Sequence, residues 1–215
     1  GQLAWTIIRC LLMVDMWVKR LIFLLIALRD LCNDQAGQII EAMLVLLLEK
    51  NSLLVDYARR IGVNFGEGLH IYGDVHWSTE PWIITLGKNC HITDGIRFLT
   101  HDGGVLLFRD RVPDLELTRP ITIGDNVYIG TSSIIMGVFI GNDVIIGAGS
   151  IVTKDIPSNS LVVGTPARVI KTADDYFEKA QRESLHCGNL HGEQKDRRLK
   201  EIYGYVGSSR GIYEF

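Results

Sequence analysis

The 215-residue chain has few cysteines and prolines and little excess of charge of either sign. Its four cysteines include no Cys-x-x-Cys pair, which argues against a zinc-finger spacing or a disulfide framework and favours a reducing, cytoplasmic setting. The formal net charge of −3 leaves no broad basic surface, so we expect no nucleic-acid partner. The cysteines are Cys10, Cys32, Cys90 and Cys187.

Long apolar runs are also lacking. The most apolar stretch, residues 21–28, is far shorter than the roughly twenty residues that a membrane-spanning helix needs. No small-residue cleavage site follows it, so we expect no signal peptide. Contact with a membrane is therefore expected to be peripheral at most.

Helical periodicity marks both ends of the chain. Before residue 61, leucines recur at spacings of three and four, with a break at 33–37, which predicts a helical N-terminal segment over 1–60. The apolar surface of such helices must be buried, and we expect it to pack against the rest of the chain or a partner subunit. Residues 172–215 are charged and predict a C-terminal helical extension, divided near Gly188 and Gly192.

A six-residue period replaces the helical one between residues 61 and 171. Three hexads of this kind can form one triangular coil, and successive coils pair as parallel strands about 4.8 Å apart. Glycine at the corners permits tight turns, and the 22 glycines of the chain suit this requirement. The leading aliphatic residues are Leu86, Ile92 and Phe98, then Ile123, Ile129 and Ile135, then Ile140, Ile146 and Val152.

Three segments carry a family resemblance: FLTHDGG, IGDNVYIG and IGAGSIVTKDIPSNSLVVGTPARVIK. They resemble the hexapeptide-repeat acyltransferases, in particular the branch of maltose/galactoside and capsular-polysaccharide O-acetyltransferases. The resemblance covers residues 61–171. It implies a mainly β chain folded as a left-handed parallel β-helix, acetyl-CoA as cosubstrate, and a homotrimer with active sites between subunits.

His101 is the candidate catalytic base. It precedes residues 102–119, which break the hexad pattern and predict a projecting loop, and such loops often carry function. A neutral imidazole can accept the proton of a sugar hydroxyl that attacks a thioester. The THDG segment resembles the catalytic histidine motif of the family. Asp94, Asp102 or a backbone carbonyl are the candidates for orienting the ring.

Other residues are candidates for the oxyanion and for the cosubstrate. Thr131, through its backbone N–H and hydroxyl, is the candidate oxyanion donor. With Asp94 and Ala148 it forms an outward column beside which a pantetheine arm can lie, and the resemblance implies coenzyme A contacts there. Cations near the end of the repeats are candidates for its phosphates. The expected cosubstrate residues are Gly130, Thr131, Ala148, Thr153, Lys154, Pro166, Arg168 and Lys171.

The acceptor is expected to be a saccharide, with surface-polysaccharide synthesis as one setting. The candidate acceptor residues are Asp74, His76, Trp77 and Tyr128, since aromatic and polar groups together suit a sugar. Phe108, in an apolar run of the loop, is expected to dock on an adjacent subunit.

Three alternatives remain at this point. The first is an N-acetyltransferase acting on an amino-sugar nucleotide or an antibiotic. The second is a metal protein like the gamma-class carbonic anhydrases, and the third is an inert scaffold. No metal is expected, because the histidines lack the spacing that the carbonic anhydrases use.

Overall fold

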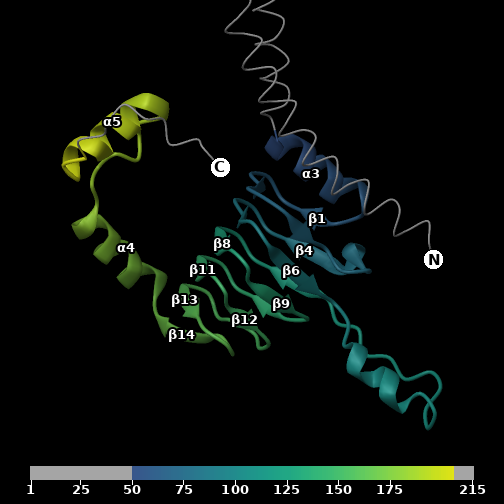
Figure 1. The fold of residues 1–215 in the computed structure, drawn as a ribbon. Helices are drawn as coiled ribbons and strands as arrows, with labels where there is room; N and C mark the ends of the chain where they lie inside the picture. Colours follow the sequence, from purple (N-terminus) through teal and green to yellow (C-terminus); the bar gives the residue numbers. More distant parts are fainter. Residues whose placement is uncertain (1–49, 206–215) are drawn as a thin grey trace, which may run out of the picture.

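The computed structural model describes residues 50–205, and it shows a β-helix with one helix before it and two after it (Figure 1). The expected helices of residues 1–49 lie outside the described residues. Helix α3 (Lys50–Arg60) covers the first coil, and α4 (Ala173–Glu183) and α5 (Gly192–Ile202) follow the last. Among the helices of the described range, none has the length and apolar character to span a bilayer.

The strands form three parallel sheets, one for each side of the coil. The first contains β1 (Asn64–Phe65), β4 (Ile84–Leu86), β7 (Ile121–Ile123) and β10 (Phe139–Ile140). The second contains β2 (His70–Ile71), β5 (His91–Ile92), β8 (Val127–Ile129), β11 (Val144–Ile146), β13 (Ser160–Val163) and the antiparallel β14 (Arg168–Lys171). The third contains β3 (Val75–His76), β6 (Ile96–Leu99), β9 (Ile134–Met136) and β12 (Ile151–Val152).

The register confirms the period-six prediction. Ile92 pairs with Ile129, which pairs with Ile146, and all three side chains are fully buried. Phe98 pairs with Ile135 in the same way on the next sheet. The leading residues therefore stack in columns inside the coil, and the fold is the expected left-handed parallel β-helix with helical segments.

Polar side chains tie each corner to the coil before it. The Asp125 carboxylate accepts a hydrogen bond from the Lys88 backbone N–H (2.7 Å), and the Asn142 side-chain oxygen accepts one from the Asp125 N–H (2.8 Å). At the neighbouring position, Asn89 and Asn126 adopt positive φ, which asparagine tolerates better than most residues. Repeated corner chemistry of this kind keeps the coils in register.

Two segments depart from the regular coil. Residues 78–83, including the short 3-10 helix η1 (Pro81–Ile83), enlarge the first turn. The expected loop leaves after β6, contains the 3-10 helix η2 (Gly103–Phe108), and projects from the body in Figure 1. At its neck, the Asp102 N–H donates to Leu117 and the Arg119 N–H donates to Thr100.

The C-terminal helices occur where the sequence predicted them. Thr172 caps α4 through a capping box with Asp175. The apolar side chains of Tyr176, Phe177 and Leu185 are nevertheless exposed, and Figure 1 shows α4 and α5 leading away from the coils. This apolar face is therefore not buried against the coils within the described chain.

Candidate active site

A cavity of about 210 Å³ lies where the loop leaves the third sheet. Residues from β6, from the neck of the loop, and from the corner after β9 meet there. With Thr153 after β12, four separate parts of the sequence converge on one hollow, as expected for a binding site. Its lining is Leu99, Thr100, His101, Asp102, Leu117, Arg119, Met136, Gly137 and Thr153.

His101 is held at the edge of this cavity by a carboxylate. Its Nδ1 atom lies 3.0 Å from Glu80 Oε2 and 3.2 Å from Thr79 Oγ1. An isolated antiparallel bridge to Thr118 holds its backbone. The imidazole is 37% exposed, so it can reach a bound molecule while its orientation is maintained.

Glu80 is itself firmly positioned. One oxygen accepts a hydrogen bond from the Thr100 hydroxyl and the other accepts one from the Thr79 hydroxyl, each at 2.5 Å. These bonds, together with the neighbouring His101, lower the pKa of Glu80 to about 2. The side chain is therefore an anion at neutral pH and can only accept hydrogen bonds.

This arrangement selects the tautomer of His101. Because the ionised Glu80 can only accept, Nδ1 of His101 must carry the proton that it donates to this carboxylate. The lone pair of the neutral ring is then on Nε2. Nε2 is then available as a base, with the ring held by its other nitrogen. The same division of roles operates in serine-histidine-aspartate triads.

The two carboxylates expected to orient His101 bond elsewhere, so that expectation is corrected. Asp94 accepts from the Asp74 backbone N–H at 2.6 Å, as a corner side chain, and Asp102 accepts from Gly104 N–H at 2.9 Å, as the cap of η2. Glu80 occupies the expected position instead. Paired residues of β3 and β6 are 21 positions apart, and the same offset places Glu80 beside His101.

The expected column of Asp94, Thr131 and Ala148 exists. Ser132 N–H donates to Asp94 O, and Gly149 N–H donates to Thr131 O, so successive coils stack there. This column lies at the corner after the second sheet, whereas His101 lies at the corner after the third. The structure therefore does not bring Thr131 and His101 into one cavity within a single chain.

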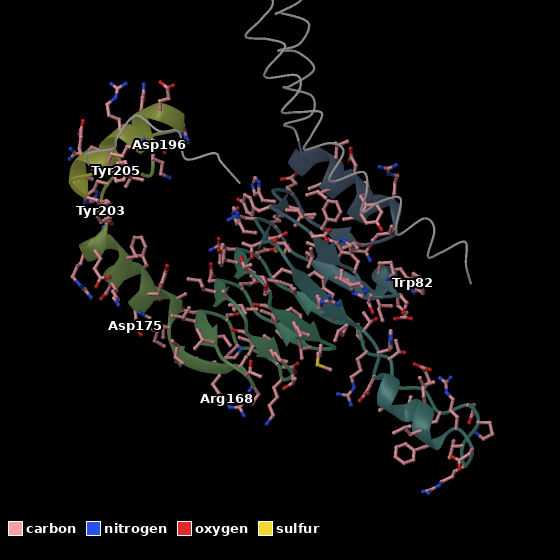
Figure 2. The ribbon with its side chains drawn as sticks, viewed as in Figure 1. Trp82, Arg168, Asp175, Asp196, Tyr203 and Tyr205 are labelled. Carbon is pink, nitrogen blue, oxygen red and sulfur yellow. The ribbon has the colours of Figure 1, made fainter. Side chains whose placement is uncertain are left out.

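The other expected cosubstrate residues divide into two groups. Thr153 lines the His101 cavity, whereas Lys154 and Arg168 are exposed near the C-terminal end of the coils, where Figure 2 labels Arg168. Lys171 Nζ lies 5.4 Å from the centre of the Tyr176 ring. Pro166 follows Thr165 in the exposed turn between β13 and β14.

Packing between successive coils requires glycine at position 130. A Cβ atom there would come within 2.5 Å of the Ala148 backbone nitrogen, so the glycine permits the close approach of the next coil. The expectation that Gly130 binds the cosubstrate gains no separate support from its position.

Trp77 is a clear correction among the acceptor candidates. Its side chain is only 5% exposed and stacks on Phe98, with 5.0 Å between ring centroids, because it occupies the inward position one coil earlier. Asp74 and His76 are exposed, and Tyr128 lies on the second sheet beside His91. None of these four residues lines the cavity at His101.

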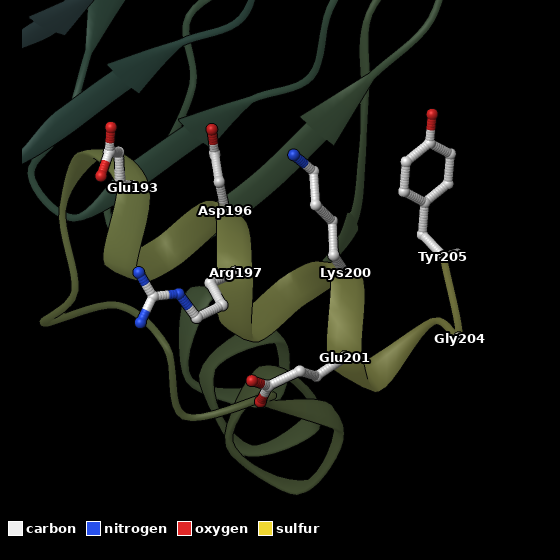
Figure 3. A pocket seen from close by; sticks show the side chains of 7 residues that line it. All are labelled: Glu193, Asp196, Arg197, Lys200, Glu201, Gly204 and Tyr205. Carbon is white, nitrogen blue, oxygen red and sulfur yellow. The ribbon is translucent and has the colours of Figure 1, made fainter. Parts of the chain in front are cut away.

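A larger hollow of about 580 Å³ lies on α5 and the residues after it (Figure 3). Charged side chains of this one helix, including Glu193, Asp196 and Lys200, make up most of its lining. None of these side chains is a histidine held by a carboxylate, as His101 is held by Glu80. We therefore regard the smaller cavity as the candidate active site.

Within residues 50–205, no group of three His, Cys, Asp or Glu side chains is arranged to hold a metal ion. Of the expected sites, only the one at His101 combines a cavity with a positioned titratable pair.

Comparison with known proteins identifies relatives of this chain. A family model described as the hexapeptide repeat of succinyl-transferase matches residues 120–154. Protein CapG of Staphylococcus aureus is 42% identical over 156 residues, which cover 71% of this chain and 90% of that protein.

Solved structures of two acetyltransferases match part of this chain. A galactoside acetyltransferase in complex with coenzyme A is 35% identical, with a TM-score of 0.42; the match covers 54% of this chain and 62% of that one, so it spans less than two thirds of that protein. A hexapeptide-repeat acetyltransferase of Vibrio cholerae, complexed with acetyl-CoA, is 28% identical over 62% of this chain and 78% of that chain, with a TM-score of 0.44.

Proposed function

The chain belongs to the hexapeptide-repeat acyltransferases, and from this premise we propose that it transfers an acetyl group from acetyl-CoA to a saccharide hydroxyl. The observation that carries the proposal is the pair of Glu80 and His101 at the edge of the cavity. A hydroxyl group needs such a base, because it is a weak nucleophile near neutral pH.

The reaction begins when the acceptor hydroxyl gives its proton to Nε2 of His101. Its oxygen forms a bond to the thioester carbonyl carbon, and the tetrahedral intermediate carries a negative oxygen. Glu80 stabilises the imidazolium that forms. The carbon–sulfur bond then breaks, His101 returns the proton to the departing sulfur, and the products are an acetyl ester and a free thiol.

The oxyanion requires a hydrogen-bond donor, and Thr131 remains our candidate. Since Thr131 and His101 lie at different corners of one chain, a site that uses both must combine two subunits. This requirement supports sites between subunits, and the resemblance implies that the oligomer is a homotrimer. The exposed Thr131 and the small Ala148 leave room along the corner for an extended pantetheine arm.

We propose surface-polysaccharide synthesis as the setting of the reaction, as the resemblance to the capsular-polysaccharide branch implies. Lys154 and Arg168 are the proposed phosphate contacts. Both side chains are exposed, so they are accessible to a bound molecule.

A thiol-release assay with acetyl-CoA and a panel of sugars tests the function. His101→Ala should lower turnover by at least about 10²-fold while acetyl-CoA affinity stays nearly unchanged, because the base acts in the transition state. His191→Ala is the matched control, since His191 is also exposed but lies in the C-terminal extension, outside the cavity.

Two results would count against the proposal. Turnover of His101→Ala close to that of the wild type would remove the base from the mechanism. Transfer only to amino sugars, with an amide as product, would favour N-acetyl transfer instead.

A further inference from the structure

Arg119 is fixed beside the candidate base by the neck of the projecting loop. Its backbone N–H donates to the Thr100 carbonyl oxygen at 2.7 Å, and the adjacent Thr118 bridges His101. The arginine stem lies over Gly137, where an added Cβ would come within 2.8 Å of Arg119 Cβ. The backbone and the stem of Arg119 are thus both held at the wall of the cavity.

The guanidinium of Arg119 has no recorded partner within residues 50–205. The other arginines of the loop have partners: Arg109 pairs with Glu116 at 2.7 Å, and Arg111 lies over the Phe108 ring. The carboxylates near the cavity are also engaged. Glu80 accepts bonds from two threonines and faces His101, and Asp102 caps η2.

The cavity therefore combines a base for the acceptor with one arginine whose charge no neighbouring carboxylate neutralises. A guanidinium presents a planar fork of donors that matches a carboxylate or a phosphate in two parallel hydrogen bonds. The hydroxyl oxygens of a neutral sugar can accept hydrogen bonds from a guanidinium, but only an anionic group also neutralises its charge. The side chain is suited to an anion that enters together with the reacting hydroxyl.

We propose that Arg119 binds an anionic group of the acceptor, so that the enzyme selects acidic saccharides over neutral ones. This inference rests on the proposed function and deepens it by naming the substrate class. The shared chemistry is a carboxylate, as in a uronic acid, or a phosphate, as in a sugar phosphate. Because the site is partly open to solvent, we expect a preference of about 10-fold rather than an absolute requirement.

The test compares a neutral hexoside, the corresponding uronic acid and the corresponding hexose 1-phosphate. Transfer is measured for the wild type, Arg119→Gln and Arg119→Lys. Arg97→Gln is the matched control, because Arg97 is an exposed arginine of the same coil that does not line the cavity. Binding of each sugar to the protein with coenzyme A present is measured separately by calorimetry.

We expect the wild type to prefer one of the two acidic sugars by about 10-fold in kcat/KM, and to bind it correspondingly more tightly. Arg119→Gln should abolish the preference mainly through the acceptor KM, Arg119→Lys should retain part of it, and Arg97→Gln should retain all of it. Whichever acidic sugar is preferred identifies the source of the charge.

Several outcomes overturn the inference. Equal use and equal binding of neutral and acidic sugars by the wild type would refute it while leaving acetyl transfer intact. A preference that survives Arg119→Gln, or a loss seen only in the KM for acetyl-CoA, would also refute it. Absence of transfer to any sugar would contradict the proposed function, and the binding comparison would still decide the role of Arg119.

Discussion

Replacing Glu80 with Gln tests the most specific feature of the candidate site. The amide has nearly the same shape as the carboxylate, but its single oxygen can replace only one of the two oxygens that accept from the threonine hydroxyls, and its NH2 group must donate at the other position. It also lacks the charge that faces His101 Nδ1 at 3.0 Å. A hydrogen bond to a charged group contributes about 1.5–3 kcal/mol. Loss of this contribution in the transition state corresponds to a decrease in kcat of about 10- to 10²-fold.

The effect should appear in kcat and not in binding. Glu80 does not line the cavity, so the KM for acetyl-CoA and for the acceptor should change little. Asp102→Asn is the matched control, because asparagine can still cap η2 and Asp102 bonds away from the imidazole. We expect that variant to keep turnover within about 3-fold of the wild type.

A measurement of stability separates positioning from folding. The folded-state pKa of Glu80 is lowered from 4.5 to about 2, so its stabilisation is present above pH 4.5 and is lost as the pH falls toward 2. The full shift sets an upper bound of about 3 kcal/mol, and its partial exposure reduces our expectation to about 1–2 kcal/mol. Denaturant unfolding of wild type and Glu80→Gln between pH 3 and 7 should show the difference shrinking as pH falls.

The reasoning would be refuted if Glu80→Gln folded normally and kept wild-type kcat. It would equally fail if Asp102→Asn lost as much turnover as Glu80→Gln, since the carboxylate next to the base in sequence would then be the one that orients it.

Two further predictions concern the cosubstrate and the loop. Lys154→Ala and Arg168→Ala should each raise the KM for acetyl-CoA by about 3- to 10-fold more than the KM for its dephospho form, because the lost contact is to phosphate. Lys179→Ala on α4 is the control. An equal rise in KM for both forms would contradict this role. Phe108→Asp should reduce assembly and activity together, since this aromatic side chain is 48% exposed within one chain and would lose a buried contact in the oligomer. Light scattering that shows an unchanged oligomer with full activity would exclude that docking.

The regular part of the fold was predictable because burial recurs at a short, constant spacing. A residue such as Ile129 points inward at its place in the hexad whatever lies elsewhere in the chain, and its partners Ile92 and Ile146 hold the same place in the triplets before and after it. His101 was also recognisable, since it ends a repeat and begins a segment without one. Local pattern was sufficient for the coil, whereas the candidate role of His101 also rested on the resemblance of its THDG segment to the family motif.

Trp77 was wrong as an acceptor candidate, and Glu80 was not among the candidates, because the first coil of the β-helix contains extra residues. With the 21-residue offset of β3 and β6, Trp77 falls inward beside Phe98 and Glu80 falls beside His101. The hexad count alone does not reveal where the extra residues are accommodated. That position depends on the backbone hydrogen bonds between coils.

The sequence by itself determined the coil and its inward columns, because these depend on spacing along the chain. It also made His101 the candidate base, through its place at the end of a repeat and its resemblance to the histidine motif of the family. Only the tertiary structure decided which carboxylate orients His101 and that Arg119 stands beside it. Both residues belong to irregular insertions: Glu80 lies within the turn at 78–83, and Arg119 ends the loop at 102–119. The ends of such insertions are brought together by hydrogen bonds between coils and across the neck, and no periodicity in the sequence encodes those bonds.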